Sequence, residues 1–588
     1  MQKRLVWLEY LGVIGIWFLI FGDLAFSHLA FVDYVSPEFL DIGKSLVMSN
    51  YTAFPVFFWG LELIARVLGI LPWLFQFSIL ITLLISWTYI RKLAVQGNKH
   101  EAWAWLFGLI FFFNPFVYSR IMVGQIGVLL AYLLLPMYLY YVFSLIENNF
   151  SLKYLGKTAL TSALAASLSL QFFAFHLLIF FVAFLWMCLY KRPVSRKQIW
   201  SVVIFLFLLM ACNAYWLQGL WGNPIFSASD VRHESFFAPQ PSSGIPAVAK
   251  ILGMYGFWRE ESYLTPWQLW PAWIWYCLLA VLAFLGILGY YWSSPSSKFK
   301  SRCYYTLFWL GLLLGTGASH PYTAPVFSWF FDHLPLFNGF RDSHKFVALL
   351  ALGYAGLIPE FLLAVKNKLM TSKARNVKIG ILFLLFAIFI VCFTYPLIGL
   401  HHQLRPMEYP QEYTHLDTYL EQHPTSGYAI YLPWQLYLTY TWSKNSSSDG
   451  RIAVPMNRIV HRPVIIGPDE YGAENELSSS ISFCLEIENL ECLKEMGVST
   501  IIKDVCTGYP ENYTWINSTE TFNEGCLHVY EYSSAEISSP SIPGRFILGL
   551  MISVGLVIYF LFQDILLHTL SRPGRTDTLP ATYKLPRQ

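Results

Sequence analysis

The sequence predicts a polytopic α-helical membrane protein with about twelve spans and one small domain outside the membrane near the C-terminus. Of its 588 residues, 56% are hydrophobic and only 13% are charged, about half the roughly 25% charged residues of a soluble domain. The mean hydropathy is +0.47, and the long apolar runs are interrupted by one large polar stretch between residues 400 and 545. With a formal charge of +3 and no basic stripe, the chain is neither a disordered protein nor a nucleic-acid binder.

The apolar runs are long enough to cross a bilayer, which takes about 20 residues. Leu5–Phe21 follows Lys3 and Arg4 and resembles a secretory signal, but it ends in Gly22 and Asp23 with no small-x-small cleavage site. We therefore expect an uncleaved first span. The further candidates lie near residues 73–90, 101–118, 126–146, 158–171, 172–190, 199–220, 271–292, 303–317, 346–365, 378–399 and 546–563.

The distribution of basic residues predicts the orientation. If 158–190 is a hairpin of two short helices and 54–70 is an interfacial or re-entrant helix, both termini are cytoplasmic. Every short basic cluster then lies inside: Arg91/Lys92/Lys99, Lys153/Lys157, Lys191/Arg192/Arg196/Lys197, Lys298/Lys300/Arg302, Lys366/Lys368/Lys373/Arg375 and Arg572/Arg575/Lys584/Arg587. We expect residues 1–399 to form the multi-span module, with outer loops 23–72, 221–270 and 318–345, and a cell membrane is the expected location.

Residues 400–545 are expected to form an extracytoplasmic domain, followed by a final span and cytoplasmic tail over 546–588. Short apolar strands are predicted within it, and the helical stretch Glu486–Met496 precedes one of them. This pattern indicates a small α/β or α+β domain. The predicted strands are Tyr428–Leu432, Val464–Ile466, Thr500–Ile502 and Leu527–Tyr530.

Cysteines and glycosylation acceptors support this orientation. Four cysteines gather in the outer domain, and an even number in an oxidising compartment favours two disulfides. The simplest pairing is Cys484 with Cys492 and Cys506 with Cys526, although four cysteines allow three connectivities and a zinc site is the alternative. The predicted N-glycosylation acceptors on the outer side are Asn50, Asn445, Asn512 and Asn517.

Four groups of polar residues lie on the outer face at the expected membrane boundary, where ionisable groups suggest function. Each also has a structural explanation: a solvated loop, an arginine reaching to the interface or an Asn-Pro helix stop. The groups are Asp23/His28/Asp33/Glu38/Asp41, the segment Asn114–Gln125, the segment Asn338–Phe346, and Asp230/Arg232/His233/Glu234 with Arg259/Glu260/Glu261. Their convergence favours chemistry, because a carboxylate can accept a proton from a hydroxyl while Arg and Lys neutralise a leaving phosphate.

These features resemble the GT-C superfamily of integral-membrane glycosyltransferases, which use polyprenyl-phosphate sugars as donors. The segment Asn114-Pro115-Phe116-Val117-Tyr118-Ser119-Arg120, with Gly124-Gln125, is similar to one in arabinofuranosyltransferase D-like and YfhO-like membrane proteins. Phe340-Arg341-Asp342-Ser343-His344-Lys345-Phe346 is similar to their Arg-Glu-Pro-x-Lys-Phe-type segment, with Asp for Glu and Ser for Pro. Asn213–Trp216 and Leu493–Ile502 also resemble segments of that family. A Trp-Trp-Asp-Tyr-Gly-type segment is absent from the sequence, which disfavours a protein-modifying oligosaccharyltransferase.

The resemblance implies roles for individual residues. The catalytic base is expected in the first outer loop, as Asp23 or Asp33. The donor phosphate is expected at Arg120, Arg341 and Lys345, with Gln125 and His344 orienting it. Some superfamily members need a divalent metal, for which Asp23, Asp33 and Asp342 are candidate ligands, but no spacing demands one.

The resulting hypothesis is sugar transfer from a lipid-phosphate donor to an extracytoplasmic glycan, lipid or protein. Membrane lipids are the other expected partners, and nucleic acid is not. Two alternatives remain: a transporter or flippase of a lipid-linked glycan, and a non-catalytic surface-assembly scaffold. A flippase would be expected to show a repeat and ionisable residues at mid-membrane, whereas His176 is nearly alone within the spans.

Overall fold

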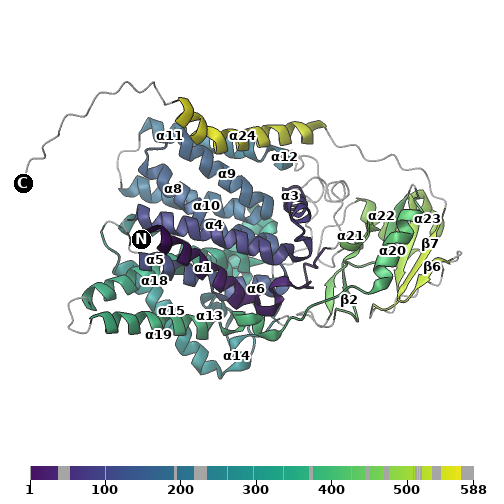
Figure 1. Ribbon diagram of the computed structural model, residues 1–588, viewed down its shortest axis with the longest axis horizontal. Helices are drawn as coiled ribbons and strands as arrows, with labels where there is room; N and C mark the ends of the chain where they lie inside the picture. Colours follow the sequence, from purple (N-terminus) through teal and green to yellow (C-terminus); the bar gives the residue numbers. More distant parts are fainter. Residues whose placement is uncertain are drawn as a thin grey trace, which may run out of the picture.

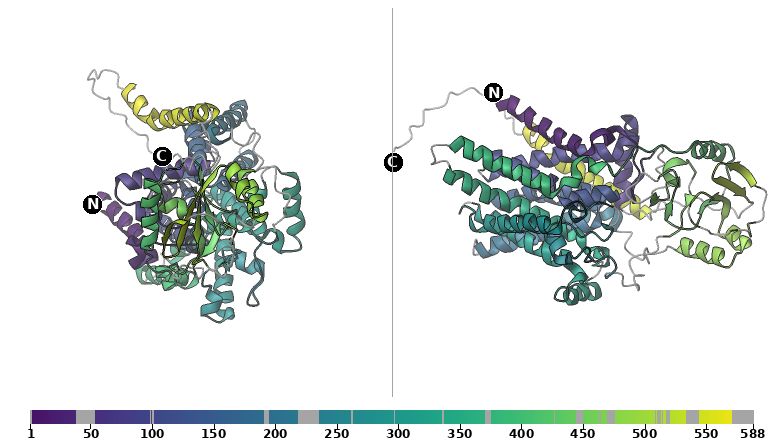
Figure 2. Two further views of the ribbon diagram at one scale, coloured as in Figure 1. Left: turned by 90° about the vertical axis from the view of Figure 1, so that its right-hand side faces the viewer. Right: turned by 90° about the horizontal axis from the view of Figure 1, so that it is seen from below.

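The computed structural model shows a bundle of helices with a mixed α/β domain packed against one end (Figures 1 and 2). It describes residues 2–37, 53–97, 99, 101–190, 195–217, 235–260, 263–295, 297–334, 337–369, 375–425, 427–443, 450–462, 464–468, 476–507, 509, 513, 515–516, 520–532 and 544–570. The four predicted glycosylation acceptors, Asn50, Asn445, Asn512 and Asn517, lie outside these residues.

The bundle is built mainly from long apolar helices, and short 3-10 turns shape its outer end. These 3-10 turns include η1 (Gly22–Phe26), η8 (Ser343–Phe346) and η9 (Tyr395–His402). The helices are α1 (Gln2–Phe21), α3 (Ala53–Val67), α4 (Leu74–Gln96), α5 (Glu101–Phe112), α6 (Pro115–Val123), α7 (Ile126–Leu133), α8 (Leu135–Glu147), α9 (Leu152–Leu168), α10 (Leu170–Tyr190), α11 (Arg196–Cys212), α12 (Ala214–Leu217), α13 (Ala247–Leu252), α14 (Pro266–Leu269), α15 (Ala272–Tyr291), α16 (Lys298–Thr316), α17 (Ala324–His333), α18 (Val347–Leu369), α19 (Arg375–Phe393) and α24 (Gly544–Leu570).

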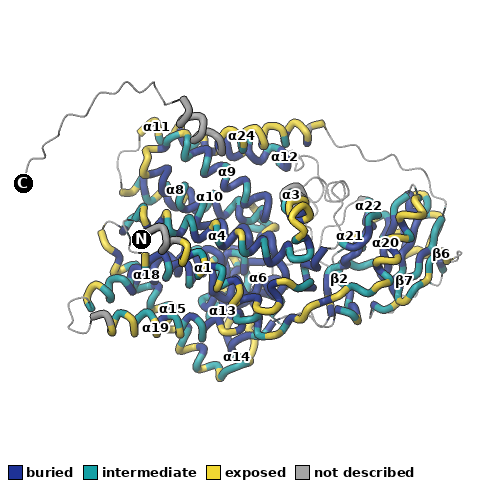
Figure 3. The backbone as a smooth tube through the Cα atoms, in the orientation of Figure 1, coloured by how far each residue is buried: buried dark blue, intermediate teal, exposed yellow. Residues whose placement is uncertain are grey.

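The apolar helices identify an integral membrane protein. Six helices of the described chain are long and apolar enough to cross a bilayer, or up to eight if each of two bent pairs is one span. The expected count of about twelve stays a prediction. Large apolar side chains on the bundle's outer surface are exposed, including Phe207 (72%) and Phe284 (60%), as in helices that face lipid. Exposed residues line the outer sides of α3, α19 and α24 in Figure 3.

The first bent pair explains the Asn-Pro segment. Helices α5 and α6 meet at 41°, and Asn114 caps α6 by accepting the Val117 N–H at 3.1 Å. Its amide group also donates to the carbonyl oxygens of Ile110 and Phe111 at the end of α5. Pro115 has no N–H and suits the first helical turn. Asn114 thus ends α5 and begins α6. The bend at this residue changes the direction of the chain at the outer end of the bundle.

The predicted hairpin over 158–190 is present as α9 and α10. The ring of Phe150, just before α9, packs against Phe184 near the end of α10, so the two helices run antiparallel. Described residues of several basic clusters therefore lie at one end of the bundle, where Lys300 pairs with Glu147 and the Arg302 guanidinium lies over Trp186. That this end faces the cytoplasm stays a prediction.

Helix α3 corresponds to the helix expected over residues 54–70, whose interfacial or re-entrant position stays a prediction. Ile64 and Val67 are 58% and 80% exposed, whereas Glu62 is buried. Glu62 pairs with Arg458 of the outer domain. Burial raises the Glu62 pKa, and Arg458 opposes that rise. One face of α3 is therefore available to lipid while the other ties the membrane module to the outer domain.

The outer domain is a three-layer α/β unit with a mixed sheet. The strand order is β4-β1-β5-β7-β6, with β4, β1 and β5 parallel and β7 and β6 antiparallel. Ala429 and Tyr431 face the core beneath α20 and α21, while Ile430 and Leu432 face α22 and α23. The elements are α20 (Gln411–Gln422), β1 (Tyr428–Leu432), β2 (Tyr437–Thr439), β3 (Arg451–Ala453), α21 (Met456–Ile459), β4 (Val464–Ile465), α22 (Glu476–Glu486), α23 (Leu490–Glu495), β5 (Val498–Asp504), β6 (Glu520–Glu524) and β7 (Leu527–Glu531). The four predicted strands are confirmed, whereas the expected helix Glu486–Met496 is only the end of α22 followed by α23.

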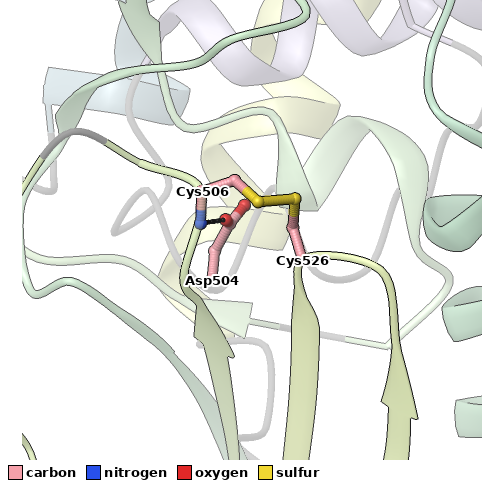
Figure 4. A group of neighbouring side chains, drawn as sticks. All are labelled: Asp504, Cys506 and Cys526. Atoms are coloured by element: carbon pink, nitrogen blue, oxygen red, sulfur yellow. Dashed lines mark hydrogen bonds between the residues drawn. A yellow bond between two sulfur atoms is a disulfide. The ribbon is translucent and has the colours of Figure 1, made fainter.

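Both disulfides have the predicted pairing, Cys484–Cys492 and Cys506–Cys526. The second bridge joins the end of β5 to the β6–β7 turn beside Asp504, whose carboxylate accepts the Cys506 N–H at 2.9 Å (Figure 4). Burial raises the pKa of Asp504, against hydrogen bonds from Tyr431 and Tyr413 that lower it. These four cysteines do not form the alternative zinc site, because a disulfide-bonded cysteine has no thiolate to bind a metal.

Removal of the second bridge gives a direct test of its contribution. We expect the Cys506→Ala/Cys526→Ala variant to lose about 2–4 kcal/mol of outer-domain stability. Thermal unfolding of the purified protein, followed by tryptophan fluorescence, measures this loss. Dithiothreitol should lower the midpoint of the wild type more than that of the variant, and equal shifts would contradict the prediction.

Candidate functional site

The first outer loop carries Asp33 to the junction between the helix bundle and the outer domain. Ala30 and Val35 form a bridge that closes a tight turn, and both side chains belong to the outer domain's hydrophobic core. The outer-domain N–H groups of Met407 and Ala453 donate to the carbonyl oxygens of His28 and Val32. On the bundle side, the Asp33 N–H donates to the carbonyl of Val123, at the end of α6.

Three side chains from distant parts of the chain hold the Asp33 carboxylate. Arg259 and the Tyr437 hydroxyl donate to Oδ1 at 3.0 and 2.9 Å, and Gln125 Nε2 donates to Oδ2 at 3.0 Å. The Arg259 guanidinium also stacks against the rings of Trp258 and Tyr437. A carboxylate has about four acceptor positions, so Oδ2 keeps one for a further donor.

Gly124 makes the approach of this loop to α6 possible. Its φ of +80° is left-handed, and it ends α6 so that Gln125 turns toward Asp33. A Cβ on Gly124 would lie 2.6 Å from Phe31 Cβ and 3.0 Å from Tyr34 Cβ. Only glycine fits this position without displacing the loop.

Gly124→Ala is accordingly expected to destabilise the protein by at least about 1–2 kcal/mol, from the left-handed backbone alone, and to displace Asp33. Detergent-based unfolding of the purified protein measures the effect. Gly15→Ala is the matched control, since Gly15 lies in α1 with no atom within 4 Å of an added Cβ. Equal stability of the two variants would contradict this account of Gly124.

Arg120 is the centre of a buried network behind Asp33. Its side chain is 0% exposed and lies 4.3 Å from the Phe257 ring centroid. Nη1 donates to Gln125 Oε1 and to Asp342 Oδ2, the latter at 3.0 Å. Nη2 lies 2.8 Å from His344 Nδ1. Gln125 therefore links Arg120 directly to Asp33.

The charges of this network follow from its contacts. Arginine only donates hydrogen bonds, so the facing His344 Nδ1 is the unprotonated acceptor and the ring proton lies on Nε2. Burial alone would raise the pKa of Asp342, but the positive charges of Arg120 and Lys345 hold it below its usual value. Asp342 is thus an anion paired with Arg120.

Arg341 and Lys345 are the more accessible cations of the site. Both are half-buried, and the Arg341 guanidinium lies 4.7 Å from the Phe237 ring centroid. The Lys345 ammonium makes no side-chain hydrogen bond within the described residues. It interacts electrostatically with Asp342, Arg120, Arg341 and Asp33. The structure thus brings five of the predicted donor-binding residues to one region beside Asp33.

Asp23 does not join this region. It is exposed in η1, at the mouth of the first span, and its side chain has no hydrogen bond or ion pair among the residues described. Glu38, Asp41, Asp230, Arg232, His233, Glu234 and Glu261 lie outside the described residues. Glu260 instead pairs with the buried Lys250, which closes the loop that carries Arg259.

Sequence reasoning missed two contributors to the site. Tyr437 lies 404 positions from Asp33, and nothing in its local sequence distinguishes it from the other tyrosines. Arg259 belongs to the fourth of the polar groups named in the sequence, but no role was predicted for it. Gln403 holds the Arg259 loop in place, because its side chain contacts both the Leu264 N–H and the Tyr118 hydroxyl of α6.

The carboxylates of the site do not fit a divalent cation. Asp33 and Asp342 are each paired with an arginine, and Arg120 and Gln125 lie between them. A cation would require these oxygens to converge and the guanidinium groups to withdraw. Elsewhere, Asp417, Glu421 and His461 form a partly exposed cluster, in which His461 donates its backbone N–H to Asp417.

Comparisons with known proteins identify the fold. No protein-family model matches the chain, and no curated protein sequence matches it. The cryo-EM structure of arabinofuranosyltransferase AftD from Mycobacteria matches with a TM-score of 0.57 at 13% identity, covering 91% of this chain and 40% of that one. Two classes of a point mutant of that enzyme give TM-scores of 0.54 and 0.52 at 12% identity, over 91% and 90% of this chain and 42% and 41% of theirs. The chain thus shares the fold of this arabinofuranosyltransferase over most of its own length and spans about two fifths of the length of these neighbours.

Proposed function

We propose that this protein is a GT-C-type membrane glycosyltransferase that moves a sugar from a polyprenyl-phosphate donor to an extracytoplasmic acceptor, with Asp33 as general base. The carrying observation is the position of the Asp33 carboxylate. It lies where the membrane module meets the outer domain, with one oxygen able to accept another hydrogen bond and with Arg341 and Lys345 nearby. The fold shared with an arabinofuranosyltransferase supports the reaction class.

In the proposed step, Asp33 Oδ2 takes the proton of the acceptor hydroxyl as that oxygen attacks the anomeric carbon. The bond between this carbon and the phosphate oxygen breaks, and the lipid phosphate leaves with the bonding electron pair. Arg341 and Lys345 neutralise the charge that grows on the phosphate. Arg259 and Tyr437 hold the other carboxylate oxygen, so Oδ2 keeps its orientation.

Arg120, Gln125 and His344 act as positioning residues in this proposal. Arg120 is fully buried and both of its Nη atoms are engaged, so direct contact with phosphate falls to Arg341 and Lys345. Gln125 transmits the position of Arg120 to Asp33 through two hydrogen bonds. The sugar acceptor would approach from the side of β2, because Tyr437 comes from the outer domain.

Purified protein in lipid nanodiscs, supplied with radiolabelled polyprenyl-phosphate sugars and candidate acceptor glycans, tests the function. Transfer of label to an acceptor supports the proposal. If the protein instead moves the labelled donor across proteoliposomes without forming product, it is a flippase. Absence of both activities across a panel of pentose and hexose donors would contradict the enzyme proposal and favour a scaffold.

Arg341→Met and Lys345→Met test the phosphate contacts. Each is expected to lower kcat/KM by about 10–100-fold, since charge-assisted hydrogen bonds contribute about 1.5–3 kcal/mol each, with little change in thermal stability. Donor analogues of different phosphate charge provide the readout. A loss that is equal for charged and uncharged analogues would argue against phosphate contact.

A further inference from the structure

A polar cavity lies at the opposite end of the bundle from Asp33. It has a volume of about 460 Å³ and lies between α1, α4, α8 and α9. Phe31, beside Asp33, stacks on Phe75 in the first turn of α4, whereas Arg91 and Lys92 line the cavity near the end of that helix. Sixteen residues of helix separate Phe75 from Arg91, or about 24 Å at 1.5 Å per residue. The cavity is therefore separate from the proposed transfer site.

The cavity carries excess positive charge. Arg91 binds Glu9 through Nε at 2.7 Å, so its two terminal nitrogens are not part of this ion pair. Lys92 Nζ lies 4.3 Å from the Tyr89 ring centroid and 5.6 Å from that of Tyr140, and no carboxylate of the described chain pairs with it. Lys157 adds further positive potential at Lys92.

The acidic residue of the cavity does not cancel this charge. Glu147 is held by Lys300 at 3.0 Å. The remaining polar lining supplies neutral groups that can bind a polar ligand. Gln96 donates to the Ser144 hydroxyl at 3.1 Å, while its own Oε1 is buried without a partner. Tyr10 and Thr88 share a hydrogen bond of 2.8 Å through their hydroxyls.

One apolar side chain, Val95, lines the cavity and is 75% exposed. The cavity thus combines a polar, cationic lining with an apolar side chain that is available to lipid, at the end of the bundle that carries Lys300 and Arg302. Basic pockets between transmembrane helices on this side suit anionic lipid headgroups.

We propose that this cavity is a binding site for a phosphate group, supplied by the headgroup of an anionic phospholipid in the leaflet nearest the basic loops. Lys92 and the terminal nitrogens of Arg91 would contact the phosphate, Gln96 and Thr88 its polar substituent, and the acyl chains would lie along Val95. The volume accommodates a glycerol-phosphate headgroup, since ligand cavities range from about 300 to 1,000 Å³. This site is independent of the proposed sugar transfer.

Native mass spectrometry of the full chain in detergent, titrated with phosphatidylglycerol or phosphatidylcholine, tests the proposal. We expect saturable binding of one phosphatidylglycerol that is tighter than that of phosphatidylcholine. Lys92→Gln should weaken phosphatidylglycerol binding about fivefold, since one basic residue near a membrane surface contributes about that factor. Lys368→Gln is the matched control, because Lys368 Nζ also lies 4.3 Å from an aromatic ring centroid, that of Trp292, away from the cavity.

A second pair of variants changes Val95, an exposed residue of the cavity lining, so that no buried group is removed. Val95→Glu should weaken phosphatidylglycerol binding more than Val95→Gln, because only the former repels a phosphate. Competition with glycerol 3-phosphate distinguishes the sources: displacement at concentrations similar to the lipid's identifies a soluble phosphate ligand, and no displacement identifies the lipid. Equal binding of the two lipids, or equal effects of Lys92→Gln and Lys368→Gln, would overturn the proposal.

Discussion

Asp33→Asn is expected to lower the rate of sugar transfer by about 10²–10⁴-fold, the usual contribution of a general base. Asparagine keeps the shape of the side chain and one acceptor oxygen for Arg259 and Tyr437, but it cannot take a proton. The loss should therefore appear in kcat rather than in KM for the donor. Single-turnover transfer with purified protein and labelled donor separates these two parameters.

Asp23→Asn is the matched control for this experiment. Asp23 also lies in the first outer loop, but it is exposed and has no side-chain partner among the described residues. We expect its activity to stay within about twofold of wild type, in line with the small effects of most exposed substitutions. Asp33→Glu should recover part of the rate, because it restores a carboxylate. If Asp23→Asn loses activity and Asp33→Asn keeps it, the assignment of the base to Asp33 is wrong.

Arg120→Met is expected to cost about 3–5 kcal/mol of stability, the largest structural effect that we predict. The reason is electrostatic, since removal of the guanidinium leaves the buried Asp342 carboxylate without its cation. His344 Nδ1 and Gln125 Oε1 lose a donor in the same variant. Titration of the purified protein with sodium dodecyl sulfate measures the free energy of unfolding.

The double variant Arg120→Met/Asp342→Leu tests this reason. Replacement of a whole buried ion pair by apolar residues is often close to neutral, so the double variant should recover most of the lost stability. Its transfer activity should stay low, because Gln125 is no longer held against Asp33. Additive losses in the two single variants and the double variant would show that the pair is not coupled.

Local patterns predicted much of the architecture. The strand Tyr428–Leu432 has the predicted bounds. Its alternate residues face helices on the two sides of the sheet, and for this reason the strand is recognisable in the sequence as a short apolar run. The disulfides formed between cysteines close in sequence, 8 and 20 residues apart. The hairpin of α9 and α10 was required by the distribution of lysines and arginines alone. Each of these features depends on neighbours in the sequence or on the cost of burying charge in lipid.

The arrangement of the site depended on contacts that no local pattern encodes. Sequence reasoning placed Asp23 and Asp33 side by side as candidates, since both follow the first span. Only the folded chain brings Gln125, Arg259 and Tyr437 to Asp33. It likewise buries Arg120 completely, although the sequence places this residue among the cations expected at a phosphate.

The sequence by itself determined that this protein lies in a membrane and predicted the simplest pairing of the four outer-domain cysteines, because hydropathy, charge and short loop closure act over neighbouring residues. The tertiary structure decided which carboxylate meets the cations, which arginine is enclosed and where a cationic cavity opens. These outcomes depend on side chains that lie up to 404 positions apart. Packing between the outer domain and the helix bundle brings them together.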